Sequence, residues 1–264
     1  FYRKRVLRLL PTYLFIAGIY WSLWLLKKYS FENGMDFFKL WIAHLSCYTW
    51  ITQNAKVFWY IPFQLFLYLF SPAILTLFTS GKKVRYFSFF LLCASCYVTL
   101  YFLLGTSYYR ILEIAIGRIP PFLCGCFIGM KVRDHEQLIK WWTLIIPVAF
   151  LSKMVRNFLI DRWHILKIFS RVPFFFIGLA FCLSSCFILS ALSSEKLNSI
   201  LRWLGTRSLE LYLLHIAYRN LTMTYFPDLV NSSTKMALLI YVIVLILSCA
   251  TAELISSMKR IKKR

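Results

Sequence analysis

Acidic residues are scarce in this sequence. Of its 264 residues only 10 are Asp or Glu, against 31 Lys or Arg, and charged residues make up 16% of the chain. An ordinary soluble domain carries about 25% charged residues, so this composition argues against one. The chain also contains no low-complexity or Gly/Ser-rich stretch and no repeat period. These absences predict a single domain, residues 1–264, without a soluble appendage.

Metal-binding and nucleic-acid-binding patterns are also missing. Cys93 and Cys96 have a CxxC spacing, and Cys124 and Cys126 lie closer still, but no second pair or His cluster accompanies them. The eight cysteines therefore read as small packing residues, and we predict no metal site. The basic residues fall between apolar runs rather than in one patch, which is typical of the loops of a membrane protein and not of a nucleic-acid-binding surface.

Apolar residues fill most of the chain, at 60%, and aromatic residues make up 19%. A helix that crosses a bilayer needs about 20 apolar residues. The predicted fold is thus an all-α, polytopic transmembrane bundle of about eight spans. They cover residues 9–26, 58–79, 86–104, 111–130, 141–159, 172–192, 203–226 and 236–257. The shorter and more polar segment 37–52 is predicted to be an interfacial or half-inserted helix.

Lys and Arg residues set the expected orientation. Cytoplasmic loops of membrane proteins are enriched in them. The densest basic clusters, at residues 1–8, 81–85, 131–140 and 259–264, fall on one side of the predicted bundle. Both termini are therefore expected in the cytoplasm.

The span 203–226 carries an unusual number of polar residues. At 100° per residue, Ser208, Tyr212, His215 and Arg219 share one face of a helix. Unpartnered polar groups are costly in hydrocarbon, so this stripe should face a water-filled cavity or the bundle interior. The alternative is that Tyr212 and His215 are hydrogen-bonding contacts between helices. Glu210 lies off this stripe, three residues from Arg207, and can pair with it near the cytoplasmic end of the span.

Other polar residues leave two readings open. Arg5 and Arg8, one turn apart, could grip phosphates together or anchor the chain to anionic lipid. Arg118 precedes Pro120 and Pro121, so its span should start or break there. Its side chain could reach the membrane surface or point into a cavity. Three further histidines are read as surface residues: His44, His135 and His164.

Four stretches occur in a fixed order within residues 1–215. They are FYRKRVLRLLPTY, the tryptophan-led FWYIPFQLFLYLFSP, RIPPFLCGCFIG and WLGTRSLELYLLH. Together they resemble acyltransferase family 3, the polytopic membrane enzymes that O-acylate bacterial surface sugars. The resemblance implies transfer of an acyl group, often acetyl, from cytoplasmic acyl-CoA to a sugar hydroxyl. Acyl-CoA would be a co-substrate rather than a bound cofactor, and the bacterial inner membrane is the implied location.

The resemblance also implies roles for individual residues. Arg5 and Arg8 match the pair that holds the CoA phosphates, and we group Lys4 with them. His215 and Ser208 match the late motif and, with Arg118, are the predicted catalytic residues. A hydroxyl that attacks a thioester needs a base and a group that stabilises the oxyanion. His215 suits the first role, or that of an orienter, and Arg118 suits the second. Contacts to the substrate are predicted for Tyr212, Arg219, Glu113 and Trp59.

The sequence departs from the family pattern in two places. Members normally begin with a further helical pair that carries the favoured catalytic His, and this chain starts at the arginine pair. Gln64 stands near a position where the family commonly has Glu. A truncated relative, catalytically inactive and acting as a structural or partner subunit, is therefore an alternative. A transporter for a lipid-linked glycan is a third reading, weakened by the lack of internal repeats.

Overall fold

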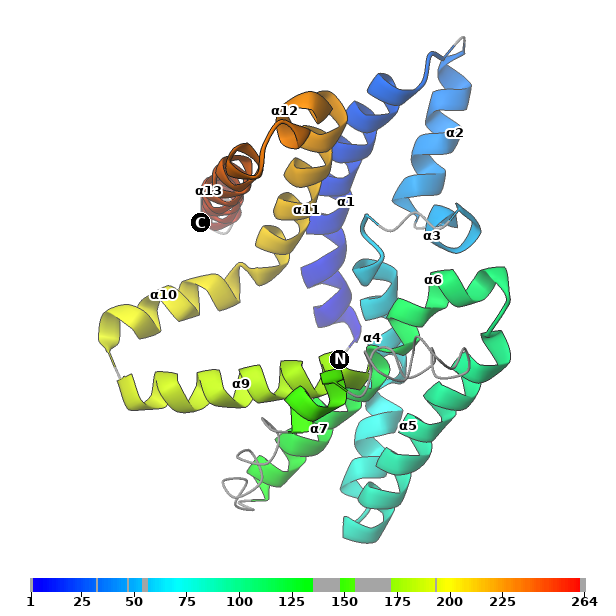
Figure 1. The fold of residues 1–264 in the computed structure, drawn as a ribbon, viewed down its shortest axis with the longest axis vertical. Coiled ribbons are helices and arrows are strands. Elements are labelled where there is room, and N and C mark those ends of the chain that lie inside the picture. The colour runs from blue at the N-terminus through cyan, green and yellow to red at the C-terminus, as the bar shows by residue number, and fades with distance from the viewer. Residues whose placement is uncertain are drawn as a thin grey trace. The chain divides into compact units, whose positions relative to one another are not determined.

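The computed structural model describes residues 2–31, 33–46, 48–53, 57–134, 148–154, 172–192 and 194–261. These residues form helices joined by short connections, without a β-strand among them (Figure 1). The predicted all-α class is therefore confirmed. The contacts divide the chain into two compact units, one of residues 1–68 and 194–264 and one of residues 69–193. Each is described separately.

Within the described residues, five helical segments are long and apolar enough to cross a membrane. They are α1 (Tyr2–Lys28), α4 (Tyr60–Thr79), α5 (Lys82–Leu103), the segment Ser107–Arg133 and the main part of α13 (Thr234–Ile261). Five of the predicted spans coincide with them. The predicted span 172–192 is the helix α9 (Val172–Leu192), with a shorter apolar core. Most of the predicted span 141–159 lies outside the described residues, so the count of eight stays a prediction.

The first unit is built around α1 and α11 (Ser208–Tyr225). The two helices run in the same direction, because Arg8 and Ser208 line one cavity at one end while the Tyr225 hydroxyl donates to the Leu23 carbonyl, at 2.8 Å, near the other. Residues with almost no exposed surface form the core between them. On α11 these are Leu213, Leu214 and Ala217, and on α1 they include Tyr13, Ile16, Ala17, Tyr20 and Trp21. The apolar face of α11 is thus its buried face.

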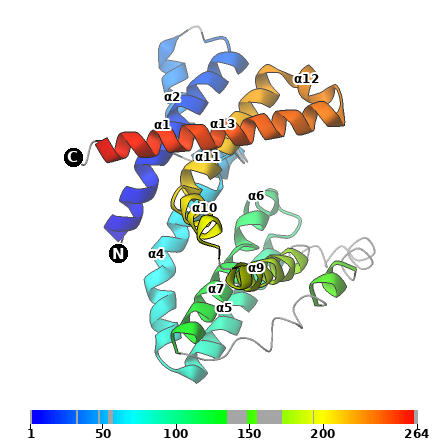
Figure 2. The ribbon, with the colours of Figure 1, turned by 90° about the vertical axis from the view of Figure 1, so that its left-hand side faces the viewer.

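Helix α13 packs on another side of α11 after the short helix α12 (Pro227–Asn231). The hydroxyls of Tyr218 and Thr251 share a hydrogen bond of 2.8 Å, and the start of α11 lies beside Glu253. Figure 2 shows α13 running back across α11. The C-terminal part of α13 and the first turns of α1 therefore lie at the same end of this unit.

Helix α2 (Gly34–Leu45) folds back along α1 and is followed by α3 (Tyr48–Gln53). The Trp41 indole donates to the Gly18 carbonyl at 3.1 Å, and the Tyr13 hydroxyl donates to the Leu45 carbonyl at 2.9 Å. A Cβ atom at Gly18 would meet the Trp41 ring at 3.4 Å, an ordinary van der Waals contact, so α2 lies directly against α1 here. The segment predicted to be one helix, 37–52, is thus divided between α2 and α3, and its interfacial position stays a prediction.

His44 is buried, and the prediction that it is a surface residue is wrong. Its ring stacks on Trp21 with the centroids 4.0 Å apart, and its Nδ1 shares a hydrogen bond of 2.8 Å with the Thr49 hydroxyl. Burial, together with the charge of Lys28, lowers the pKa of His44 to about 4. The packing of α2 against α1 buries the His44 ring, which the sequence alone places at the surface. His135 and His164 lie outside the described residues.

In the second unit, α5 packs against α7 (Ile119–Arg133). The buried Arg85 guanidinium donates to the Phe78 carbonyl at 2.9 Å and to the Asp134 carboxylate at 2.7 Å, so it joins the ends of three helices. The segment that precedes α7 is α6 (Ser107–Ile116), and the helix breaks at Gly117 and Arg118. The predicted break before Pro120 is confirmed.

His44 predicts an acid-sensitive fold. Because its pKa in the folded protein, about 4, lies below the ordinary value of 6.5, the unfolded chain takes up a proton first as the pH falls. The stabilisation by neutral His44 is complete above about pH 6.5 and is lost as the pH falls toward 4. A tenfold change in proton affinity corresponds to about 1.4 kcal/mol, so the loss can reach a few kcal/mol. Thermal unfolding in detergent from pH 7 to pH 4.5 measures it. His44→Phe should flatten this dependence, and an unchanged profile would contradict the assignment.

Candidate functional site

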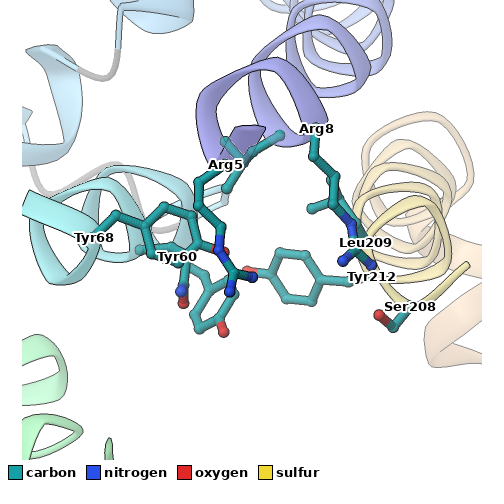
Figure 3. A pocket seen from close by; sticks show the side chains of 9 residues that line it. Arg5, Arg8, Tyr60, Tyr68, Ser208, Leu209 and Tyr212 are labelled. Carbon is teal, nitrogen blue, oxygen red and sulfur yellow. The ribbon is translucent and has the colours of Figure 1, made fainter. Parts of the chain in front are cut away.

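A cavity of about 390 Å³ lies in the first unit, where α1, α4 and α11 meet. Each helix supplies three of the residues that line it (Figure 3). They are Arg5, Arg8 and Leu9 from α1, Tyr60, Gln64 and Tyr68 from α4, and Ser208, Leu209 and Tyr212 from α11. The cavity is therefore assembled from the beginning and the last third of the chain.

Arg5 and Arg8 supply the positive charge of the cavity. They are one turn apart on α1, and Figure 3 shows both guanidinium groups pointing toward the rings of the other two helices. The Arg5 guanidinium lies 5.7 Å from the centre of the Tyr68 ring, at cation–π distance. Both side chains are exposed, so their charges face solvent-accessible space rather than a core.

Tyr60, Gln64 and Tyr68 form the wall contributed by α4. They are four residues apart, which places them on one face of the helix. The Tyr60 ring packs edge-on against Tyr212 with the centroids 5.3 Å apart. The sequence prediction did not assign these three residues to the site. The spacing of Tyr60, Gln64 and Tyr68 within an apolar run was the signal that could have found them.

The first turn of α11 forms the third wall. The helix begins after Arg207, and Ser208 and Leu209 are its first two residues. The backbone N–H groups at the start of a helix have no partner within it, and the helix dipole makes that end positive. The Ser208 hydroxyl donates to the Gly205 carbonyl at 3.1 Å. This end of α11 therefore favours an anion in the same place as the two arginines.

Taken together, the lining favours a phosphorylated ligand. Among the described residues it contains two arginines and three tyrosines, and it contains no Asp or Glu. Arginine binds phosphate through paired hydrogen bonds, and tyrosine rings offer flat surfaces for an aromatic or apolar group. The cavity volume of about 390 Å³ is enough for the phosphorylated end of a large ligand.

A cluster of three side chains holds the start of α11 in place. The Arg207 guanidinium pairs with the Glu253 carboxylate of α13 at 2.6 Å, and the Trp203 indole donates to the same carboxylate at 2.8 Å. Arg207 also lies 4.9 Å from the centre of the Trp203 ring. The pair with Glu253 was not predicted from the sequence, and the expected pairing of Arg207 with Glu210 stays a prediction.

The break also changes the predicted span 203–226. Trp203 and the residues up to Thr206 belong to the preceding helix α10 (Glu195–Thr206), and α11 covers only Ser208–Tyr225. Of the predicted polar stripe, Ser208 and Tyr212 line the cavity. His215, about one turn further along α11, is half-buried and is not among the lining residues.

Arg219 lies outside the cavity, nearer the C-terminal end of α11. It lines a small hollow with Thr222 of α11 and with residues of α12 and α13, including Val230 and Tyr241. The polar stripe of α11 is thus divided between the cavity at its start and this hollow near its end. His215 lies between the two.

The remaining predicted residues are outside the cavity. Lys4 is exposed on the first turn of α1 and does not line it. Trp59 packs on Tyr60 and Phe63, with ring centroids 6.0 and 5.8 Å away. In the second unit, Arg118 is exposed and lines a hollow of about 130 Å³ with Pro121, Phe174 and Phe175 among others. Glu113 is a half-buried residue of α6.

Several helices long enough to cross a bilayer, with a cationic cavity beside them, define a multi-pass membrane protein. The family model of the acyltransferase domain matches residues 1–256 and so includes all four motifs, the second unit and all but the last eight residues of the first. The chain belongs to this family, acyltransferase family 3, and is a membrane acyltransferase by that membership. It matches no curated protein and no solved structure.

The cluster at the start of α11 predicts that Glu253 stabilises the fold. Glu253→Gln keeps the shape of the side chain but removes the negative charge that pairs with the buried Arg207 guanidinium. Because Glu253 is 45% exposed, we expect a loss of about 1–2 kcal/mol, below the 3–5 kcal/mol typical of a fully buried pair. Thermal unfolding in detergent measures the change. Glu195→Gln, at an exposed position of α10, is the matched control. Equal unfolding temperatures for Glu253→Gln and wild type would refute the role.

Proposed function

We propose that this chain transfers an acyl group, in the simplest case acetyl, from acyl-CoA to a hydroxyl of a surface or lipid-linked glycan. The observation that carries the proposal is the cavity that brings Arg5 and Arg8 together with Ser208 and Tyr212. These residues come from two of the motifs by which the sequence resembles the family, and they are about 200 positions apart. The identities of the acyl donor, acyl-CoA, and of the acceptor, a glycan hydroxyl, are both proposed.

The donor fits the cavity by its chemistry. Coenzyme A carries several phosphates next to a flat adenine ring, and the cavity offers two arginines, the positive end of α11 and three tyrosines. Acyl-CoA is larger than a cavity of about 390 Å³, so its acyl end would extend away from the arginines. Lys4, exposed beside them, adds positive charge at the mouth without lining it.

The reaction requires a proton acceptor. The glycan hydroxyl oxygen attacks the thioester carbon, a C–O bond forms and the C–S bond breaks. The hydroxyl proton leaves to a base, and the CoA sulfur takes up a proton as it departs. His215 is proposed as that base or as the group that orients the hydroxyl. It follows Tyr212 along α11 by about 4.5 Å of helix axis, on the side of the cavity away from Ser208.

The other predicted residues stay in the proposal, and the position of each in the structure supports a particular role. The position of Ser208 on the cavity wall favours a role in binding the donor. Arg118, with an exposed guanidinium, is proposed to stabilise the negative charge of the transition state. Contacts to the glycan are proposed for Tyr212, Arg219, Glu113 and Trp59.

The proposed location is the bacterial inner membrane with both termini in the cytoplasm. The distribution of Lys and Arg supports this orientation. It agrees with the first unit, in which the first turns of α1 and the C-terminal part of α13 share one end. The donor site would then open on the side where CoA is found.

Removal of either arginine should weaken binding of the donor. A hydrogen bond to a charged group contributes about 1.5–3 kcal/mol, so Arg5→Ala and Arg8→Ala should each weaken CoA binding about tenfold or more. Titration of the purified protein with acetyl-CoA, followed by calorimetry or thermal shift, measures the dissociation constant. Gln64→Glu adds a negative charge to the cavity wall, and because this charge repels the CoA phosphates it should also weaken binding.

Two variants serve as controls for this experiment. Arg3→Ala removes the same charge from an exposed position of the same helix turn, outside the cavity. Gln64→Met keeps the size of the wall residue without adding charge. Both should bind acetyl-CoA as the wild type does. If Arg3→Ala weakened binding as much as Arg5→Ala, the effect would belong to the net charge of the protein and not to the cavity.

His215→Ala should remove transfer without removing donor binding. Loss of a general base lowers the rate by about 10²–10⁴-fold, whereas the arginines remain in place. Release of CoA thiol by membrane vesicles that contain the native glycan lipids measures the rate, and the titration above measures binding. Full activity of His215→Ala would exclude it as the base. Tight binding of acetyl-CoA with no transfer by the wild type would favour the inactive partner subunit.

A further inference from the structure

Helix α10 gathers its aliphatic residues on one side. At 100° per residue, Leu197, Ile200, Leu201 and Leu204 fall within an arc of about 100°. The rest of the circumference carries Trp203, whose indole bonds to Glu253, and the charged and polar residues Glu195, Lys196, Asn198, Ser199, Arg202 and Thr206. A strong separation of faces with little net hydrophobicity is typical of a helix that lies on a membrane surface rather than across it.

The protein covers the apolar face of α10 only in part, with Leu197 and Leu201 half-buried and Ile200 and Leu204 exposed. Within the described part of the chain none of its residues is buried, and Ile200 and Leu204 are 56% and 39% exposed. Figure 1 shows α10 turning away from the line of α11 instead of continuing it. Large apolar side chains gathered on one exposed face indicate that something apolar covers that face.

The position of α10 within the first unit indicates what covers it. Trp203, in its last turn, bonds to Glu253, and Arg207 directly after it pairs with the same carboxylate. This fixes the end of α10 where α11 starts and where the C-terminal part of α13 lies. Arg5 and Arg8 reach the same level through the shared cavity. Since α1 and α13 are long enough to cross a bilayer, this level is the end of the crossing helices, where the headgroups begin.

The charges near α10 suit anionic headgroups. Lys196 and Arg202 lie on its polar face, and Arg3 and Lys4 are exposed at the same end of the unit. Basic residues near an anionic membrane surface are attracted to it within about a Debye length. We infer that α10 is a membrane-surface helix, which lies in the plane of the bilayer with Leu197, Ile200, Leu201 and Leu204 among the acyl chains. Its partner is a phospholipid surface with anionic headgroups.

This placement bears on the cavity. Because α10 is attached to α11 through Arg207, its position in the headgroup layer fixes the depth of Ser208. The mouth of the cavity is thereby held beside the water phase. The inference does not depend on the proposed acyl transfer, so its test is a structural one.

The test places a fluorescent amino acid on each face of α10. It replaces Leu204 in one variant and Ser199, on the opposite face, in another. Each full-length protein is reconstituted into vesicles of phosphatidylethanolamine and phosphatidylglycerol that contain lipids with a nitroxide on the acyl chain. Quenching by these lipids should be about twofold or more stronger at 204 than at 199. Quenching by aqueous iodide should have the opposite order.

Other patterns would overturn the inference. Equal iodide quenching at both positions would place α10 in water. Protection of position 204 from both quenchers would mean that protein covers the apolar face, from this chain or a second copy. Equal lipid quenching at both positions would mean that α10 is immersed rather than lying at the surface. A label at Ile200, on the apolar face, repeats the result expected for 204 and guards against a local effect of one substitution.

Discussion

The packing of α11 against α1 is the contact on which the first unit depends. Leu213 and Ala17 have no exposed surface, and Ala217 and Ile16 belong to the same buried core. Small residues let two helices approach closely in a membrane, where dispersion contacts replace the hydrophobic effect as the source of association. The relative direction of the two helices determines which residues meet at the cavity. Because the helices run the same way, the arginine turn of α1 meets the positive end of α11 rather than its negative end.

The helical architecture could be predicted from the sequence because hydrocarbon leaves few alternatives to a helix. The break before Pro120 was equally readable, since proline acts locally. The break at Arg207 was not readable in the same way. At this break Arg207 pairs with a carboxylate 46 positions away, Glu253 of α13, and no local pattern reveals such a contact. The polar stripe of α11 was found by its period, but which neighbour covers each part of it depends on tertiary contacts.

The site was only partly predictable for a related reason. Arg5, Arg8, Ser208 and Tyr212 were found through a family resemblance and the rule that polar residues in a span need a partner. Tyr60, Gln64 and Tyr68 were missed, because aromatic residues in an apolar run look the same whether they fill a core or line a cavity. His44 was misplaced because its ring is buried by Trp21, a partner that helical periodicity cannot reveal.

The division of the cavity between α1 and α11 has a consequence for biogenesis. During synthesis α1 and α4 are made long before Ser208 has left the ribosome, so the growing chain must carry two of the three walls of the cavity and one uncovered side of α1. The entropy cost of closing a loop rises only slowly with loop length. The large separation in sequence therefore delays assembly of the cavity more than it lowers the stability of the folded protein. A nascent chain arrested before residue 208 would hold every arginine of the site and still lack its other wall.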